Sequence, residues 1–448
     1  MMSAWKNKRG FLLFLIGLIS CIAYYFFAYH YVRTDLAQLG ILYTVLFGLF
    51  FLLVHYFKDD FKSLTLLAIL FRVTLIVAIP NLSQDFYRFI WDGRMILEGL
   101  NPYLYTPGSF IDIGKYPIHQ AHELFQGMGH LSAGNHTNYP PLNQLCFVIA
   151  GLFSGSSISG AVIVMRVLII IADVGTLLVG KKLLKSLQIP TSRIFWYILN
   201  PFVIIELTGN LHFESVMIFF LILSLYLLHK SKWKMAALVL AISISIKLIP
   251  LIFLPLFFKK LGFKKWILFC AIVGFTSVLL FAPFLSIEFV HNYTNTVALW
   301  FQKFEFNASI YYLIREIGYS YRGYNEIATI GKILSFTVLL FVLLAAFSKK
   351  NETTKGLIIC MLFVLVSYFF TTTTMHPWYL ATPLFLSLFT RYKFTLVWSL
   401  VIFLSYYTYA NDSNINSYWV LLIEYGIVYS VFFYEVFSTS TCIKKNLT

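Results

Sequence analysis

The chain has 448 residues, of which 59% are hydrophobic, 19% aromatic and only 12% charged, and its formal net charge is +15. A water-soluble domain has too little interior to hide so much apolar surface, so the composition predicts an all-α polytopic membrane protein. The positive charge does not indicate nucleic-acid binding, because the Lys and Arg residues occur in short clusters between apolar stretches. The scattered Cys residues fit neither a disulfide framework nor a zinc site. The sequence shows no nucleotide-binding motif either, and we expect no metal and no cofactor.

Apolar stretches along the chain predict about 12 to 14 transmembrane helices in a single integral membrane domain over residues 1–448. Lys6, Lys8 and Arg9 precede the first stretch and place the N-terminus in the cytoplasm. Pro250 and Pro255 predict broken or re-entrant helices, because the two stretches there are shorter than the ~17 residues that a span needs. The expected spans are 10–31, 39–57, 63–80, 161–180, 192–207, 213–229, 235–247, 248–258, 266–285, 328–347, 356–373, 378–390, 394–410 and 418–438.

Two long segments, 81–160 and 286–327, lie outside the membrane in this topology. The first contains the polar run Ser83–Tyr105, directly after an apolar stretch, and an apolar stretch at Pro140–Ser154 that we expect to form a partly buried external helix. The second mixes aromatic, Lys, Glu and Arg residues, which is typical of amphipathic helices that lie on a membrane surface. Both segments are therefore candidates to carry a functional site.

Asp85 and Asp92 are the first candidate pair in the external segment 81–160. They are seven residues apart, about two turns of a helix, and so would share one face. A carboxylate at a membrane surface is costly, which favours a functional role: one acts as general base and the other orients it or binds a hydroxyl. The alternative is that Asp85 caps a helix, that Asp92 is solvated, or that Arg88 and Arg94 pair with them.

Two further groups of polar residues fall on the same side. Tyr139, in the run Asn138-Tyr-Pro-Pro-Leu-Asn143, can stack on a ligand ring, although the prolines also suit a plain helix start. An external hairpin between two spans carries Glu206, Asn210, His212 and Glu214. Helix capping explains Asn210 but not the three titratable side chains, so this hairpin is a candidate functional site.

Cations supply the last element of the expected site. Lys247 and Arg166 lie near the outer ends of apolar stretches, where they can bind a lipid phosphate or simply snorkel to the interface. Arg72 falls in the middle of a span and needs a partner. His376 follows four threonines and precedes Pro377, and presents a polar tip outward unless the segment is only a kinked aromatic belt.

The order of these motifs resembles GT-C glycosyltransferases. Asp-Phe-Tyr, Trp-Asp-Gly, Gly-Leu-Asn-Pro-Tyr and Tyr-Pro-Pro-Leu are followed by LNPFVIIELTGNLHFES, by Lys247–Pro250 and by HPWYL, over residues 80–390. The set is most similar to bacterial membrane mannosyltransferases and to the catalytic subunit of GPI mannosyltransferase I. The first two spans lie outside the resemblance.

The resemblance implies a sugar donor carried on a polyprenyl phosphate and a catalytic acid in the first external loop, at the position of Asp85. Related eukaryotic enzymes have an acidic pair two residues apart at this motif, whereas this chain has Ser83-Gln84-Asp85, which favours a metal-independent reaction. The expected function is inverting transfer of a hexose to a lipid-linked or envelope glycan, and mannose is the favoured hexose. The transfer is expected on the outer face of a bacterial plasma membrane. Membrane lipids are the other expected partner. The alternative is a transporter or flippase for a lipid-linked sugar.

In that mechanism Asp85 deprotonates the acceptor hydroxyl, and Lys247, or else Arg166 or Arg315, stabilises the departing phosphate. His376 binds the phosphate or the sugar. The expected sugar and acceptor contacts are Asp92, Tyr139, Glu206, Asn210 and His212.

Overall fold

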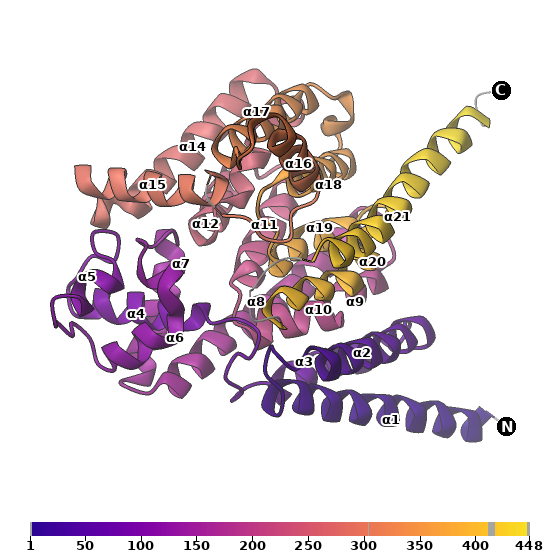
Figure 1. The fold of residues 1–448 in the computed structure, drawn as a ribbon. Coiled ribbons are helices and arrows are strands. Elements are labelled where there is room, and N and C mark those ends of the chain that lie inside the picture. The colour runs from indigo at the N-terminus through magenta and orange to yellow at the C-terminus, as the bar shows by residue number, and fades with distance from the viewer. Residues whose placement is uncertain (1, 303, 411–416, 446–448) are drawn as a thin grey trace. The chain divides into compact units, whose positions relative to one another are not determined.

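The computed structural model describes residues 2–302, 304–410 and 417–445. Within these ranges the secondary structure is helical, and the strand-like contact that occurs is an isolated bridge between Phe306 and Thr374. The predicted all-α class is therefore confirmed (Figure 1). The chain forms two compact units, which are described separately.

The first unit comprises residues 1–32, 41–251 and 264–299. It contains most or all of α1 (Met2–Tyr29), α2 (Leu36–Tyr56), α3 (Phe61–Thr74), α4 (Asp85–Leu97), α5 (Pro107–Ile111), α6 (Ala121–Ala133), α7 (Pro141–Ser154), α8 (Ile158–Ser186), η1 (Thr191–Ile194), α9 (Phe195–Ile198), α10 (Pro201–Val203), η2 (Ile204–Gly209), α11 (Glu214–His229), α12 (Trp233–Ile246), α14 (Phe263–Phe281), η4 (Ala282–Phe284) and α15 (Ile287–Gln302).

The second unit comprises residues 33–40, 252–263 and 300–448. It contains most or all of η3 (Ile249–Phe257), α13 (Phe258–Leu261), α16 (Ile310–Arg322), α17 (Ile327–Ala346), η5 (Lys349–Glu352), α18 (Thr354–Thr371), η6 (Pro377–Leu380), α19 (Ala381–Ser387), α20 (Phe394–Val401), η7 (Ile402–Ala410) and α21 (Tyr418–Lys445).

Seven helices of the described chain are long and apolar enough to cross a membrane, and their positions match seven of the expected spans. They lie in α1, α2, α8, α14 with η4, α17, α18 and α21. An eighth span results if the bent pair Pro201–Gly209 and Glu214–His229 is counted as one. The chain is therefore a multi-pass membrane protein, with fewer uninterrupted long helices than the expected 12 to 14 spans.

The remaining expected spans form short or broken helices. The segment 63–80 gives only α3, which ends at Thr74, and α12 has 14 residues. After α12 the chain continues as the 3-10 helix η3 with Pro255 inside it, which agrees with the broken helix predicted from the two prolines. These segments are apolar, so their sequences resemble spans although their helices are short.

A sharp bend of 113° separates Pro201–Gly209 from α11. The π-helical turn η2 leads into it, and Leu211 then has a φ of 63°, a conformation that ends a helix. The buried guanidinium of Arg166 donates hydrogen bonds to the carbonyls of Thr208 and Gly209 at 2.9 Å each. Arg166 thereby satisfies carbonyl groups that the interrupted helix leaves without partners.

The segment 81–160, which the sequence predicts to be external, folds as a compact group of helices in which α4 packs on α6 and α7 (Figure 1). The contact with α7 is close at Gly93, where an added Cβ would come within 2.4 Å of the Phe147 carbonyl oxygen. Two arginines of α4 hold the surrounding loops. Arg88 donates to the carbonyls of Ser132 and Asn135, and Arg94 to backbone carbonyls before α6 and before α8.

Candidate active site

Four side chains from separate elements of the first unit meet beside α4 and form what we call the carboxylate–lysine cluster. Asp85 lies in the first turn of α4, and Tyr139 stands just before α7. Glu214 is the first residue of α11, and Lys247 follows the last residue of α12. The cluster brings together side chains from segments that are far apart in the sequence.

Local structure fixes each of these residues at the end of a helix. The amide of Gln84, just before Asp85, donates to the Met128 carbonyl at 3.0 Å and holds the start of α4 against α6. Pro140 and Pro141 follow Tyr139, and proline suits the first turn of α7 because it needs no hydrogen-bond partner for an N–H group. Lys247 has an extended backbone, which ends α12 and turns the side chain away from the helix.

The electrostatics of the cluster rest on one ammonium group shared between acidic partners. Lys247 Nζ lies 3.2 Å from Glu214 Oε1 and 5.1 Å from the centre of the Tyr139 ring. Burial, the largest effect, and the Glu214 charge raise the pKa of Asp85. The Lys247 charge and a hydrogen bond with the Tyr139 side chain lower the pKa of Asp85. The net effect is a raised pKa, so Asp85 is a stronger base than an exposed aspartate.

Packed aromatic rings from α4, α7 and the start of α11 lie beside the cluster. The rings of Phe89 and Phe147 stack at 4.6 Å, and Phe89 meets the edge of Tyr139 at 5.0 Å. Phe213, next to Glu214 in the sequence, packs against both phenylalanines. These contacts keep water from one side of the cluster and hold Tyr139 in one orientation.

Asp92 lies on the same helix as Asp85 but belongs to the scaffold of the segment. Its carboxylate is fully buried and accepts hydrogen bonds from Arg88 at 2.7 Å and from the Gln144 amide at 3.1 Å. The pairing with Arg88 is the alternative that the sequence left open. Asp92 therefore ties α4 to α7.

The hairpin residues Glu206, Asn210 and His212 are all buried at the bend before α11. The Asn210 side chain accepts a hydrogen bond from the Leu82 N–H at 3.1 Å and donates to the Ile205 carbonyl at 3.1 Å. Asn210 thus joins the bend to the chain just before α4, which places Glu214 on the side of Asp85.

The two fully buried arginines, Arg72 and Arg166, have structural partners. Arg72 pairs with Asp173 at 2.7 Å and donates to two carbonyls, so the partner expected for a mid-span arginine is present. Arg166 donates three hydrogen bonds to the carbonyls of Ile76, Thr208 and Gly209. This arrangement assigns Arg166 to the bend, and it leaves Lys247 as the cation of the cluster.

Arg315 and His376 belong to the second unit. Arg315 forms ion pairs with Glu305 and Glu316, and its guanidinium lies 4.5 Å from the Tyr312 ring. His376 is stacked on Trp378 at 4.5 Å and on Phe306 at 5.0 Å between ring centres. Both side chains therefore have extensive contacts within their own unit.

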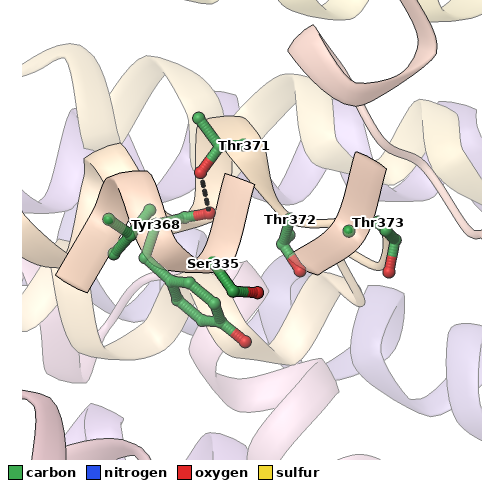
Figure 2. A pocket seen from close by; sticks show the side chains of 7 residues that line it. Ser335, Tyr368, Thr371, Thr372 and Thr373 are labelled. Atoms are coloured by element: carbon green, nitrogen blue, oxygen red, sulfur yellow. Dashed lines mark hydrogen bonds between the residues drawn. The ribbon is translucent and has the colours of Figure 1, made fainter. Parts of the chain in front are cut away.

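A small pocket in the second unit lies between α17 and α18, lined by the hydroxyl-bearing residues Ser335, Tyr368 and Thr371 to Thr373 (Figure 2). The Thr371 hydroxyl donates to the carbonyls of Ser367 at 2.9 Å and Tyr368 at 3.2 Å, the second of which is drawn in Figure 2. The hydroxyl of Thr372 accepts from the Thr374 N–H. These hydroxyl groups form hydrogen bonds at the C-terminal end of α18. The residues that line the pocket include no charged side chain, unlike the carboxylate–lysine cluster.

Glu214 is the member of the cluster that the sequence placed in the candidate hairpin without assigning it a contact. It stands in the hairpin that the sequence marked, two residues after His212, at the first turn of an apolar helix. The sequence feature that could have identified Glu214 is an acidic residue at the start of a helix, beside a polar hairpin. Its partner Lys247 is contributed by the next helix, so the pairing required the packing of α11 on α12.

Two comparisons place the chain in a known family. Residues 3–260, more than half of the chain and including all four cluster residues, match the family model "Alpha-(1->6)-mannopyranosyltransferase, N-terminal domain". A stretch of 187 residues, 41% of this chain, is 26% identical to alpha-(1->6)-mannopyranosyltransferase A of Corynebacterium glutamicum and spans 36% of that protein. The expected resemblance to bacterial membrane mannosyltransferases is confirmed, and the chain belongs to the alpha-(1->6)-mannopyranosyltransferase family.

Proposed function

We propose that the chain is a hexosyltransferase that moves mannose from a polyprenyl-phosphate donor to a hydroxyl group of a lipid-linked or envelope glycan. The observation that carries the proposal is the partly buried Asp85 with a raised pKa beside the ammonium of Lys247. A base and a fixed cation are what transfer from a phosphate-linked sugar requires. The family membership supports mannose as the sugar.

The proposed reaction is a single displacement. The Asp85 carboxylate takes the proton of the acceptor hydroxyl, and the acceptor oxygen attacks the anomeric carbon of the donor sugar from the face opposite the phosphate. The bond between that carbon and the phosphate oxygen breaks, and its electron pair leaves with the polyprenyl phosphate. The anomeric configuration is therefore inverted, and the proton ends on Asp85 before it passes to solvent.

Lys247 stabilises the negative charge that grows on the phosphate as the bond breaks. One fixed hydrogen-bond donor at a developing oxyanion contributes about 10²–10³ in kcat, and an ammonium can act in the same way. Glu214 holds the ammonium at 3.2 Å, and the bend with Glu206, Asn210 and His212 carries the proposed contacts with the sugar. A lipid-linked donor suits a multi-pass protein, and we place the reaction on the outer face of a bacterial plasma membrane.

The test is transfer of label from polyprenyl-phosphate-mannose to a membrane extract by the purified, reconstituted protein. Asp85→Asn keeps the size of the side chain and removes the base, so transfer should fall about 10²–10⁴-fold. Asp112→Asn is the matched control, because Asp112 is an exposed aspartate of the same external segment. Equal rates for the two variants would rule out Asp85 as the base.

Two further arms of the same experiment test the donor and the stereochemistry. Polyprenyl-phosphate-glucose, offered in place of the mannose donor, should be a poor substrate. The anomeric configuration of the product, read by NMR, should be opposite to that of the donor. Movement of the labelled lipid across the bilayer without transfer of its sugar would instead support a flippase.

A further inference from the structure

Tyr103 is a buried tyrosine of the first external segment, between α4 and α5, that the proposed mechanism does not use. Its side chain is fully buried. Its ring packs edge-to-face against Phe284, Phe289 and Tyr293, with ring centres 5.1, 5.1 and 5.7 Å away. These three residues come from η4 and α15, so Tyr103 joins the external segment to a later part of the first unit.

The Tyr103 hydroxyl donates a hydrogen bond of 2.6 Å to the backbone carbonyl of Tyr139. The Tyr103 carbonyl in turn accepts from the Asn292 amide at 3.2 Å, and the Tyr293 hydroxyl donates to the neighbouring Asn138 carbonyl at 3.3 Å. The backbone at 138–139 is therefore held from α15 and by Tyr103 just before it enters α7.

Tyr139 connects this anchored backbone to the chemistry of the cluster. Its side chain forms a hydrogen bond with Asp85, and its ring lies 5.1 Å from Lys247 Nζ. A shift of the Tyr139 backbone moves both contacts together, since both are made by the same rigid ring.

We propose that Tyr103 is a positioning residue of the transferase: its hydroxyl fixes the Tyr139 backbone and so holds the Tyr139 ring against Asp85 and Lys247. The inference rests on the proposed function, because it takes Asp85 to be the base. A group that acts only through the orientation of a base affects the chemical step more than substrate binding.

Tyr103→Phe is the informative substitution, because it keeps the buried ring and removes only the hydroxyl. We expect kcat to fall about tenfold with KM within about twofold, as for the loss of one well-made hydrogen bond that orients a reacting group. The hydrogen bond from Tyr139 lowers the pKa of Asp85, so its weakening should move the acid limb of the kcat profile to higher pH. Tyr105→Phe is the control, because Tyr105 lies two residues away and is exposed.

The experiment measures kcat, KM, the pH profile and thermal unfolding for Tyr103→Phe, Tyr105→Phe and Asp85→Asn in one reconstituted system. A wild-type pH profile and a wild-type kcat in Tyr103→Phe would overturn the inference, even if its unfolding temperature falls. If Asp85→Asn is inactive in that case, the proposed function survives without the Tyr103 role. Full activity of Asp85→Asn would overturn the proposed function and this inference together.

Discussion

Replacement of Lys247 by Met tests the electrostatic core of the proposed site. The ion pair between Lys247 and Glu214 spans 3.2 Å, for which Coulomb's law gives about 5 kcal/mol at an effective dielectric constant of ~20. Part of this is offset by desolvation, and the Lys247 side chain is 18% exposed. We therefore expect Lys247→Met to lower the free energy of unfolding by about 3 kcal/mol, the lower end for a buried pair that loses one partner.

The double variant Lys247→Met with Glu214→Gln separates stability from catalysis. It leaves no unpaired charge at this pair, so the unfolding temperature in detergent should return most of the way to that of the wild type. Transfer should stay about 10²–10³-fold below the wild type, because the cation that we propose to stabilise the departing phosphate is still missing. Recovery of transfer in the double variant would show that Lys247 serves only to neutralise Glu214.

The pH dependence of kcat/KM gives a second, independent readout. The Lys247 charge lowers the pKa of Asp85 and the Glu214 charge raises it. Lys247→Met should therefore move the acid limb to higher pH, whereas Glu214→Gln should move it to lower pH. Shifts in the same direction, or no shift in either variant, would refute the assignment of the acid limb to Asp85.

Three further predictions concern stability. Burial raises the pKa of Asp85 above its ordinary value of 3.8. The stability that the Asp85 carboxyl group contributes is therefore complete below pH 3.8 and is lost as the pH rises through the raised pKa. Asp85→Asn should unfold at a higher temperature than the wild type at pH 7, and the difference should shrink in acid. Arg72→Met should cost about 3–5 kcal/mol by thermal unfolding, because Asp173 is left unpaired at 2% exposure, and adding Asp173→Asn should recover part of the loss. Gly93→Ala should cost about 1–3 kcal/mol, since its Cβ would meet a carbonyl of α7, whereas Gly48→Ala, which meets nothing within 4 Å, should be tolerated.

The long apolar helices could be predicted from the sequence because length and hydrophobicity are local properties. The bend before α11 could not, because its carbonyls are satisfied by Arg166 from another helix. Nothing in the sequence around Arg166 distinguishes a cation that binds backbone carbonyls from one that binds a lipid phosphate. Segments such as 235–247 are predicted as spans from their apolar composition alone, whereas the residue at which the helix ends depends on neighbouring elements.

The candidate site was predictable where a charged side chain lies beside an apolar stretch, because burying such a charge costs free energy. Asp85 and Lys247 are charged groups next to apolar stretches, and the structure brings both into one cluster. Asp92 carries the same local signal as Asp85, yet its second partner is the amide of Gln144, which is distant in the sequence. Which of two carboxylates on one helix is paired and which remains available is decided by tertiary contacts, so spacing alone could not separate them.

The chain order of the cluster has a consequence for how the protein is made. Asp85, Tyr139 and Glu214 are synthesised before Lys247, so a nascent chain that ends after α11 holds two carboxylates without the ammonium that neutralises them. Like charges disfavour close approach, and the site therefore gains its stable geometry only when α12 delivers Lys247. A chain stalled or truncated before that point lacks the cation that the proposed mechanism assigns to the departing phosphate.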